Sequence, residues 1–254
     1  INEEWLDDRA RYSYDGLAKN RIDRPYVRDE KSGKLKEASW EEVFALIKNK
    51  LEGVKPENIA ALAGNMVDVE AMVAMKDLMA SIGSPNIDCR TDGSLFSTED
   101  RASYLFNSTI AGIDECDALL LVGVNPRHEA TLVNARIRKN WLAKKIPISV
   151  IGEEVDLTYP YFHAGTKPDD LVKMAKEHAG KVEAKKPMMI VGSGVFQRED
   201  GMAVHAMLHD VAEKLGVING DWNGFNVLHQ AASRVGGLDV DFLPQKGGKT
   251  FNEI

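Results

Sequence analysis

Cysteine is scarce in this sequence: the 254 residues include Cys89 and Cys116 and no other cysteine. The two lie 27 positions apart, and isolated thiols of this kind are typical of a reducing compartment, where each behaves as a small buried apolar side chain. A cubane iron–sulfur cluster usually takes four thiolate ligands. The chain therefore cannot supply a complete ligand set for such a cluster by itself.

Long apolar runs and a positive net charge are also missing. The longest strongly apolar run, Ala118 to Val124, is far shorter than the roughly 20 residues that a membrane-spanning helix needs, so we predict no direct membrane insertion. Lys and Arg number 32 against 39 Asp and Glu, a net charge of −7. That balance lacks the positive field that attracts nucleic acid, so we predict no nucleic-acid partner.

Composition and periodicity divide the chain into three parts. Residues 1–38 are rich in charge and carry scattered aromatics, and we interpret them as an irregular arm; a floppy terminus is the alternative. We expect Trp5, Tyr12 and Tyr14 of this arm to form exposed surface that meets a neighbour. Residues 39–112 are predicted to form a first α/β segment, and residues 113–254 a Rossmann-like α/β segment.

Strands and helices alternate beyond the arm. Ser39 followed by Glu42 predicts a helix that starts with a capping box. Predicted strands cover residues 59–63, 87–89, 118–124, 148–151 and 188–191, and predicted further helices cover 69–82, 97–106, 130–144, 171–179, 202–215 and 225–235. The strands are short and apolar without polar alternation, so we expect burial on both faces. The sequence therefore predicts an α/β fold, doubly wound, with mainly parallel sheets.

The strand–turn–helix unit at residues 119–139 is the strongest candidate for a binding site. In open α/β sheets, ligands lie beyond the carboxyl ends of strands and near helix N-termini. Gly123 permits a close approach of backbone or ligand, Asn125 can cap the turn, and Arg127 is expected at the rim. An ordinary strand-to-helix turn is the alternative explanation.

Other motifs are weaker. Gly192 and Gly194 resemble the start of a dinucleotide loop, but Gln197 stands where the third glycine belongs. His205 and His209 share a helix face, yet no third metal ligand has a suitable spacing. A basic cluster could meet a phosphate or an acidic partner, or form a solvated face; it comprises Arg136, Arg138, Lys139, Lys144 and Lys145. We therefore predict no catalytic residue and no metal ligand.

Several long motifs resemble one family. They read INEEWLDDRARYSYDGL, NSTIAGIDECDALLLVGVNPRHEATLVNARIRKNWL, EVDLTYPYFHAG, KKPMMIVGSGVFQREDG and GDWNGFNVLHQAAS, and together they span nearly the whole chain. They resemble the large iron–sulfur subunit of NADH–quinone oxidoreductase, which is respiratory complex I. The resemblance is to the part with a molybdopterin oxidoreductase-like fold, related to formate dehydrogenases.

The resemblance implies a structural domain without chemistry of its own, which supports electron transfer from NADH to quinone. It implies that the 2Fe–2S and 4Fe–4S clusters belong to an N-terminal part that this sequence lacks, in keeping with a chain that begins at Ile1 and not at Met. It also implies neighbours in the hydrophilic arm of complex I. The implied place is peripheral, at the cytoplasmic face of the bacterial inner membrane or the matrix side of the mitochondrial inner membrane.

Molybdenum enzymes of this fold supply Cys, selenocysteine or Ser to the metal, and Ser94 falls near that place. Its acidic surroundings, TDGSLFSTED, lack the residues expected beside a working ligand. We expect Ser94, Gly123, Asn125 and Arg127 to mark a vestigial pocket that holds no cofactor. The alternative hypothesis is a fragment of a working molybdopterin-dependent oxidoreductase of the formate dehydrogenase type.

Overall fold

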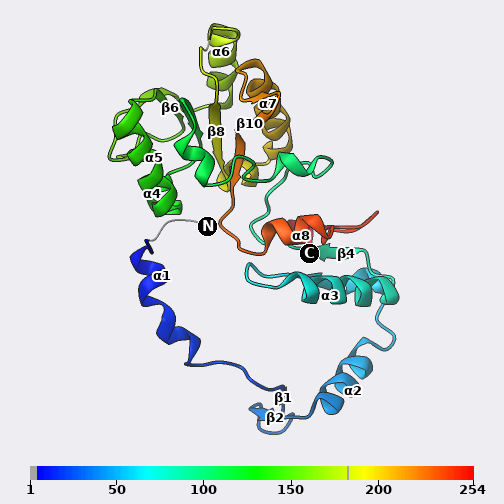
Figure 1. Ribbon diagram of the computed structural model, residues 1–254. Coiled ribbons are helices and arrows are strands. Elements are labelled where there is room, and N and C mark those ends of the chain that lie inside the picture. Colours follow the sequence, from blue (N-terminus) through cyan, green and yellow to red (C-terminus); the bar gives the residue numbers. More distant parts are fainter. Residues whose placement is uncertain (1–4, 182) are drawn as a thin grey trace.

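The computed structural model describes residues 5–181 and 183–254 and shows two lobes and an extended arm (Figure 1). The sheet lobe contains a five-stranded sheet and helices α4 to α7. The second lobe contains strands β3 and β4 with helices α3 and α8. The described part of the arm, residues 5–38, runs away from both lobes and returns through helix α2.

The sheet lobe confirms the predicted doubly wound α/β fold. Its strands are β5 (Ala118–Val122), β6 (Ile148–Ile151), β7 (Phe162–Gly165), β8 (Pro187–Gly192) and β11 (Phe225–Leu228). All neighbours pair in parallel, in the order β11-β8-β5-β6-β7. The chain thus adds strands on one side of β5, then crosses over and adds them on the other. The carboxyl ends of β5 and β8 meet at the point where this direction reverses.

Helices cover both faces of this sheet. Helices α4 (Pro126–Glu129) and α5 (Thr131–Lys144) lie on one face, and α6 (Pro168–His178) and α7 (Gly201–Lys214) lie on the other (Figure 1). Side chains of β5 alternate between two cores: Leu119 and Leu121 pack on the α5 side, whereas Leu120 and Val122 pack on the side of α6 and α7. This explains why the strand is apolar at every position.

The second lobe pairs β3 (Ala60–Leu62) with β4 (Asn86–Asp88) in parallel, beside α3 (Val69–Ile82) and α8 (Arg234–Asp239). Helix α8 lies close to α3 because Gly237 leaves room for Cys89 and Met72, which a Cβ would meet at 2.8–3.2 Å. Residues after β11 thus return to the second lobe, and the Cys89 amide donates to the Phe242 carbonyl at 3.0 Å. The division of the chain at residues 112 and 113 stays a prediction.

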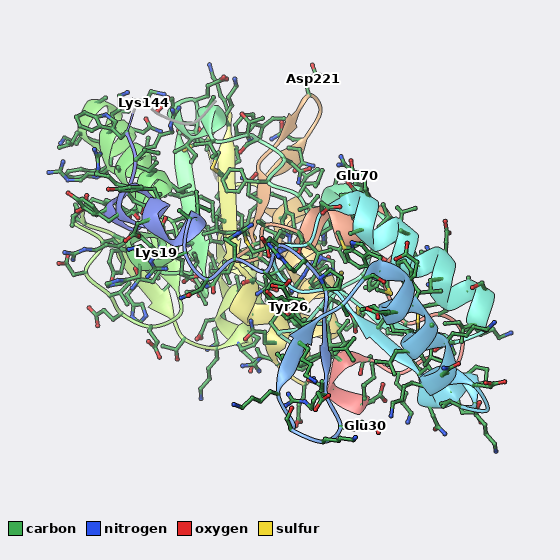
Figure 2. The ribbon with its side chains drawn as sticks, turned by 90° about the horizontal axis from the view of Figure 1, so that it is seen from below. Lys19, Tyr26, Glu30, Glu70, Lys144 and Asp221 are labelled. Atoms are coloured by element: carbon green, nitrogen blue, oxygen red, sulfur yellow. The ribbon has the colours of Figure 1, made fainter. Side chains whose placement is uncertain are left out.

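The arm is more ordered than expected. Beside α1 (Asp8–Tyr12), it contains an antiparallel hairpin of β1 (Tyr26–Arg28) and β2 (Leu35–Glu37). Its aromatic side chains are exposed as predicted, with Trp5 at 66% and Tyr12 and Tyr14 each at 69%. Figure 2 shows the hairpin reaching from Tyr26, near the middle of the view, to Glu30 toward its lower edge. That these side chains meet a neighbour stays a prediction.

Two predicted helices are wrong. Residues 97–106 contain only a 3₁₀ turn at Arg101–Ser103, because the segment bonds to the edge of the sheet: the Leu105 carbonyl accepts from the Val227 amide at 2.9 Å. Residues 225–235 begin as strand β11 and become helical only at Arg234. In both places hydrogen bonding to a neighbouring strand determines the backbone conformation, although the apolar residues are spaced as in a helix.

Helix α2 (Trp40–Leu51) begins with the predicted capping box. The Ser39 hydroxyl accepts from the Glu42 amide at 3.2 Å, and the Glu42 carboxylate accepts from the Ser39 amide at 2.8 Å. The remaining strands are β9 (Ile218–Asn219) and β10 (Trp222–Asn223), a short hairpin. Within residues 5–181 and 183–254, no helix is long and apolar enough to cross a membrane.

Loss of the cap gives a local test of this helix. Because α2 has no buried residue, tertiary packing contributes little to it, and we expect Ser39→Ala to cost about 1 kcal/mol of helix stability. Amide hydrogen exchange should rise in α2 and stay unchanged in β5 and β8. Ser81→Ala, near the end of α3, is the control; equal exchange in α2 of both variants would contradict the role of the cap.

Candidate functional site

A cleft of about 610 Å³ opens at the carboxyl ends of the central strands. Its walls come from the loops after β5, β6 and β8 and from the start of α6. The lining includes Gly123, Asn125, Gly152, Lys167, Gly194 and Arg198. The cleft therefore lies at the reversal point of the sheet, where open α/β folds bind their ligands.

Glycines stand at the ends of the two central strands, beside the cleft. Gly123 has a φ of +54°, and a Cβ on it would lie 2.3 Å from Cγ2 of Val195. A Cβ on Gly192 would lie 2.3 Å from the carbonyl oxygen of Gly123. The ends of β5 and β8 thus approach backbone to backbone, and Val195 lies over the Gly123 turn. The close approach predicted at Gly123 is made by other residues of the same chain, Val195 and Gly192.

Polar contacts fix the rim at Asn125. The Asn125 amide donates to Oε1 of Glu129 at 2.6 Å, and Oε2 of Glu129 accepts from Gln230 at 2.9 Å. The side-chain Oδ1 of Asn125 is buried and has no hydrogen-bond partner within the described part of the chain. Contrary to expectation, the Asn125 side chain does not cap the helix that follows. The carboxylate of Glu129 accepts the Asn125 backbone amide in this turn instead.

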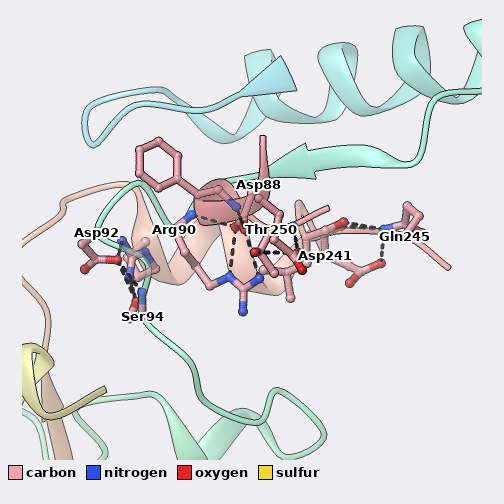
Figure 3. A network of polar contacts seen from close by, with 11 residues as sticks. Asp88, Arg90, Asp92, Ser94, Asp241, Gln245 and Thr250 are labelled. Carbon is pink, nitrogen blue, oxygen red and sulfur yellow. Dashed lines mark hydrogen bonds and ion pairs between the residues drawn. The ribbon is translucent and has the colours of Figure 1, made fainter. Parts of the chain in front are cut away.

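The four predicted pocket residues are not gathered in one place. Gly123 and Asn125 line the cleft. Arg127 instead pairs with Asp156 at 2.5 Å on the exposed surface. Ser94 belongs to a polar network between the second lobe and the loop that follows β4 (Figure 3).

Ser94 is completely buried and held by an ion pair. Its hydroxyl donates to Asp92 at 2.7 Å and accepts from Nη1 of Arg234 at 2.7 Å. Nη2 of Arg234 donates to Asp92 at 3.0 Å, and the Arg234 side chain is 1% exposed. Burial raises the pKa of Asp92, but the bonds from Ser94 and Arg234 outweigh it, so the pKa lies below its usual value. The hydroxyl of Ser94 is thereby committed to this network.

The two thiols are equally enclosed. Burial raises the pKa of Cys89 to about 11 and that of Cys116 to about 12, so both are protonated at neutral pH. Cys116 also lies within 3.4 Å of the Asn140 amide nitrogen, on the α5 side of the sheet. Neither thiol lines the cleft. As thiols they are poor metal ligands, because the thiolate is the form that binds.

The weaker motifs are dispersed. Gly194 lines the cleft, but residues 193–197 form a 3₁₀ turn, where a dinucleotide loop would lead into a helix. Within the predicted basic cluster, Arg136 is buried and pairs with Asp114 at 2.7 Å, while Lys145 lies 4.0 Å from the centre of the Trp141 ring. Arg136 therefore does not contribute to an exposed basic surface.

Sequence reasoning missed three charged residues. Lys167 and Arg198 line the cleft, and Arg234 anchors the network around Ser94. Lys167 precedes the Pro-Asp-Asp start of α6, a helix-start signal that would place it at a strand end. No pattern along the chain marks Arg234, because its partners lie 140 and 142 positions away.

Comparison with known proteins identifies the family. The model of the family described as Molybdopterin oxidoreductase matches residues 21–254. The chain belongs to the molybdopterin oxidoreductase family. Among curated relatives, it is 44% identical to the NADH-quinone oxidoreductase G-subunit of Rickettsia prowazekii over 246 residues, which are 95% of this chain and 36% of that protein. It is 39% identical over 96% of its length to the mitochondrial NADH dehydrogenase [ubiquinone] iron-sulfur protein 1 of Solanum tuberosum, of which it covers 34%. The chain thus spans about a third of the length of these relatives.

The residues of this chain do not fit a protein-bound molybdenum atom. The candidate donors Ser94, Cys89 and Cys116 are each at most 1% exposed and lie outside the cleft. Val195 lies over the glycine turn that a phosphate group would approach. No group of three or more His, Cys, Asp or Glu side chains within residues 5–181 and 183–254 is arranged to hold a metal.

Proposed function

We propose that this chain is a structural domain of the large iron–sulfur subunit of a proton-pumping NADH–quinone oxidoreductase. In this proposal it supports electron transfer from NADH to quinone by its shape and performs no chemistry itself. The match to the rickettsial NADH-quinone oxidoreductase protein over 95% of the chain is the observation that carries the proposal. The inward-facing donor atoms of Ser94, Cys89 and Cys116 support the non-catalytic role.

The proposal extends to cofactors, partners and location. The 2Fe–2S and 4Fe–4S clusters belong to another part of the subunit, because two buried thiols cannot ligate them here. The partners are the other hydrophilic-arm subunits of complex I. The domain is peripheral, at the cytoplasmic face of the bacterial inner membrane or the matrix side of the mitochondrial one. In the same proposal, Gly123, Asn125, Arg127 and Ser94 are inherited positions of a vestigial pocket.

The arm is the proposed contact with neighbouring subunits. None of its described residues is buried, and a two-stranded hairpin without further packing is marginally stable in water. Removing residues 5–37, with the hairpin, from the full-length subunit should therefore reduce its incorporation into the complex, measured on native gels, and leave the thermal unfolding of the sheet lobe unchanged. Full incorporation of the shortened subunit would contradict the contact.

The alternative function is that of a fragment of a molybdopterin-dependent oxidoreductase of the formate dehydrogenase type. The family match favours it, since the family takes its name from such enzymes. The alternative requires a metal ligand in contact with the cleft. The enclosure of Ser94 between Asp92 and Arg234 argues against that ligand.

A spectrum of the purified chain tests the proposed function. We expect no visible absorption from iron–sulfur clusters and no oxidation of NADH with an artificial electron acceptor, because the two cysteines are buried and too few to ligate a cluster. The full-length subunit, purified without oxygen, is the positive control. Cluster absorption in the 254-residue chain itself would contradict the proposal.

A further inference from the structure

Three histidines gather where the chain crosses between the lobes. His205 and His209 come from α7, and His229 follows β11. The ring centres of His205 and His209 are 4.9 Å apart, and Phe96 lies 6.0 Å from His205 and 6.1 Å from His229. The first two share a helix face, and their rings pack against one another and against Phe196 and Phe225.

His205 holds the crossing segment through both ring nitrogens. Nδ1 accepts from the Ser97 amide at 3.2 Å, and Nε2 lies 3.0 Å from the Ser103 carbonyl, to which it donates. Only the neutral ring with hydrogen on Nε2 satisfies both contacts. Protonation would put a second N–H group on Nδ1, directly against the Ser97 amide.

His229 makes a second contact with the same segment. Its Nε2 donates to the Tyr104 carbonyl at 2.7 Å, and its Nδ1 is buried without a partner in the described chain. The Nε2 of His209 is buried without a partner in the same way. A proton added to either nitrogen would therefore enter a site that offers no acceptor.

The segment held by these rings also contacts the second lobe. The Tyr104 hydroxyl donates to Asp239 of α8 at 2.8 Å, and Arg101 pairs with the same carboxylate at 2.8 Å. Residues 97–104 thus bridge α7 of the sheet lobe and α8 of the second lobe.

We propose that His205, His209 and His229 form an acid-sensitive latch, which fixes the two lobes relative to each other while the rings are neutral and releases residues 97–104 when they are protonated. The latch is independent of the function proposed above.

The charged groups around the rings do not compensate for added protons. Asp100 and Glu213 near His209 favour its protonation, but the neighbouring His205 opposes it; near His229, Asp92 favours protonation and Arg234 opposes it. Burial is the largest cause for each ring and lowers all three pKa values below the usual 6.5. A lowered histidine pKa means that the open state binds protons more tightly, so the contribution to stability is complete above pH 6.5 and is lost as the pH falls below it.

Hydrogen exchange of the 254-residue chain between pH 7.5 and 5.0 tests the latch. After correction for intrinsic rates, the Ser97 amide should lose protection about tenfold for each pH unit below 6.5 per histidine, until the folded pKa is reached. Amides of β5 and β8 should keep theirs. Constant protection at Ser97, or parallel loss in β5, would overturn the latch.

A matched pair of variants tests whether His205 causes the pH dependence of exchange at Ser97. In His205→Asn an amide oxygen replaces Nδ1 as acceptor and cannot titrate in this range, so the loss of protection at Ser97 should become about tenfold smaller for each pH unit below 6.5. His178→Asn, at an exposed position, should behave like the parent chain. If His205→Asn does not fold, the ¹⁵N shifts of the parent chain decide: hydrogen on Nε2 and a midpoint below 6.5 support the latch, while hydrogen on Nδ1 or a midpoint at or above 6.5 contradicts it.

Discussion

Gly192→Ala is expected to destabilise the sheet lobe by about 3 kcal/mol or more. The added Cβ would lie 2.3 Å from the Gly123 carbonyl oxygen and 3.1 Å from its carbonyl carbon, and backbone atoms at the ends of two central strands cannot move aside as a flexible side chain does. Urea unfolding followed by circular dichroism measures the loss. A slope with urea equal to that of the parent chain would show that both unfold as the same cooperative unit.

Gly194→Ala is the matched control for this prediction. It lies two residues beyond Gly192, it lines the cleft, and a Cβ there meets nothing within 4 Å. We expect a change within about 0.5 kcal/mol, as for an ordinary surface substitution. Equal losses in the two variants would show that the contact of β8 with β5 does not limit stability.

Arg234→Met is expected to cost about 2–3 kcal/mol, because it removes a buried guanidinium and leaves the partly buried Asp92 carboxylate without its ion-pair partner. Asp92 and Ser94 would lose the guanidinium that bonds to both, and methionine offers neither charge nor donor. Arg198→Met is the control, since Arg198 pairs with Asp200 on the surface at about half exposure. Exposed pairs contribute at most about 1 kcal/mol. Similar unfolding midpoints for the two variants would contradict the anchoring role of Arg234.

The sheet lobe could be predicted in large part because its signals are local. The apolar runs that became β5, β6 and β8 are buried on both faces, and such runs are recognisable without knowledge of their neighbours. Helix α3 has the predicted bounds, with Asp68 as its N-cap and Gly83 at a φ of +82° as its C-cap.

The predictions failed where the conformation of a segment depends on residues that are distant in the sequence. Strand β11 pairs with β8, and residues 97–106 pair with β11, so neither conformation is determined by its own spacing. The candidate site shows the same division. Gly123 and Asn125 follow from the end of one strand, whereas Ser94 is enclosed by a residue 140 positions away, and Arg127 turns outward to Asp156. The sequence indicated the place of the cleft but not the side chains that surround it.

The absence of a cofactor of its own is the central claim, and elemental analysis of the purified chain tests it most directly. Cells that synthesise an active molybdopterin enzyme should produce the 254-residue chain, so that the cofactor is available during folding. Mass spectrometry for molybdenum, tungsten and iron, with pterin fluorescence after acid release, then measures the occupancy. We predict amounts far below one per chain, because Ser94, Cys89 and Cys116 are enclosed. Stoichiometric molybdenum or tungsten with a released pterin would contradict the account.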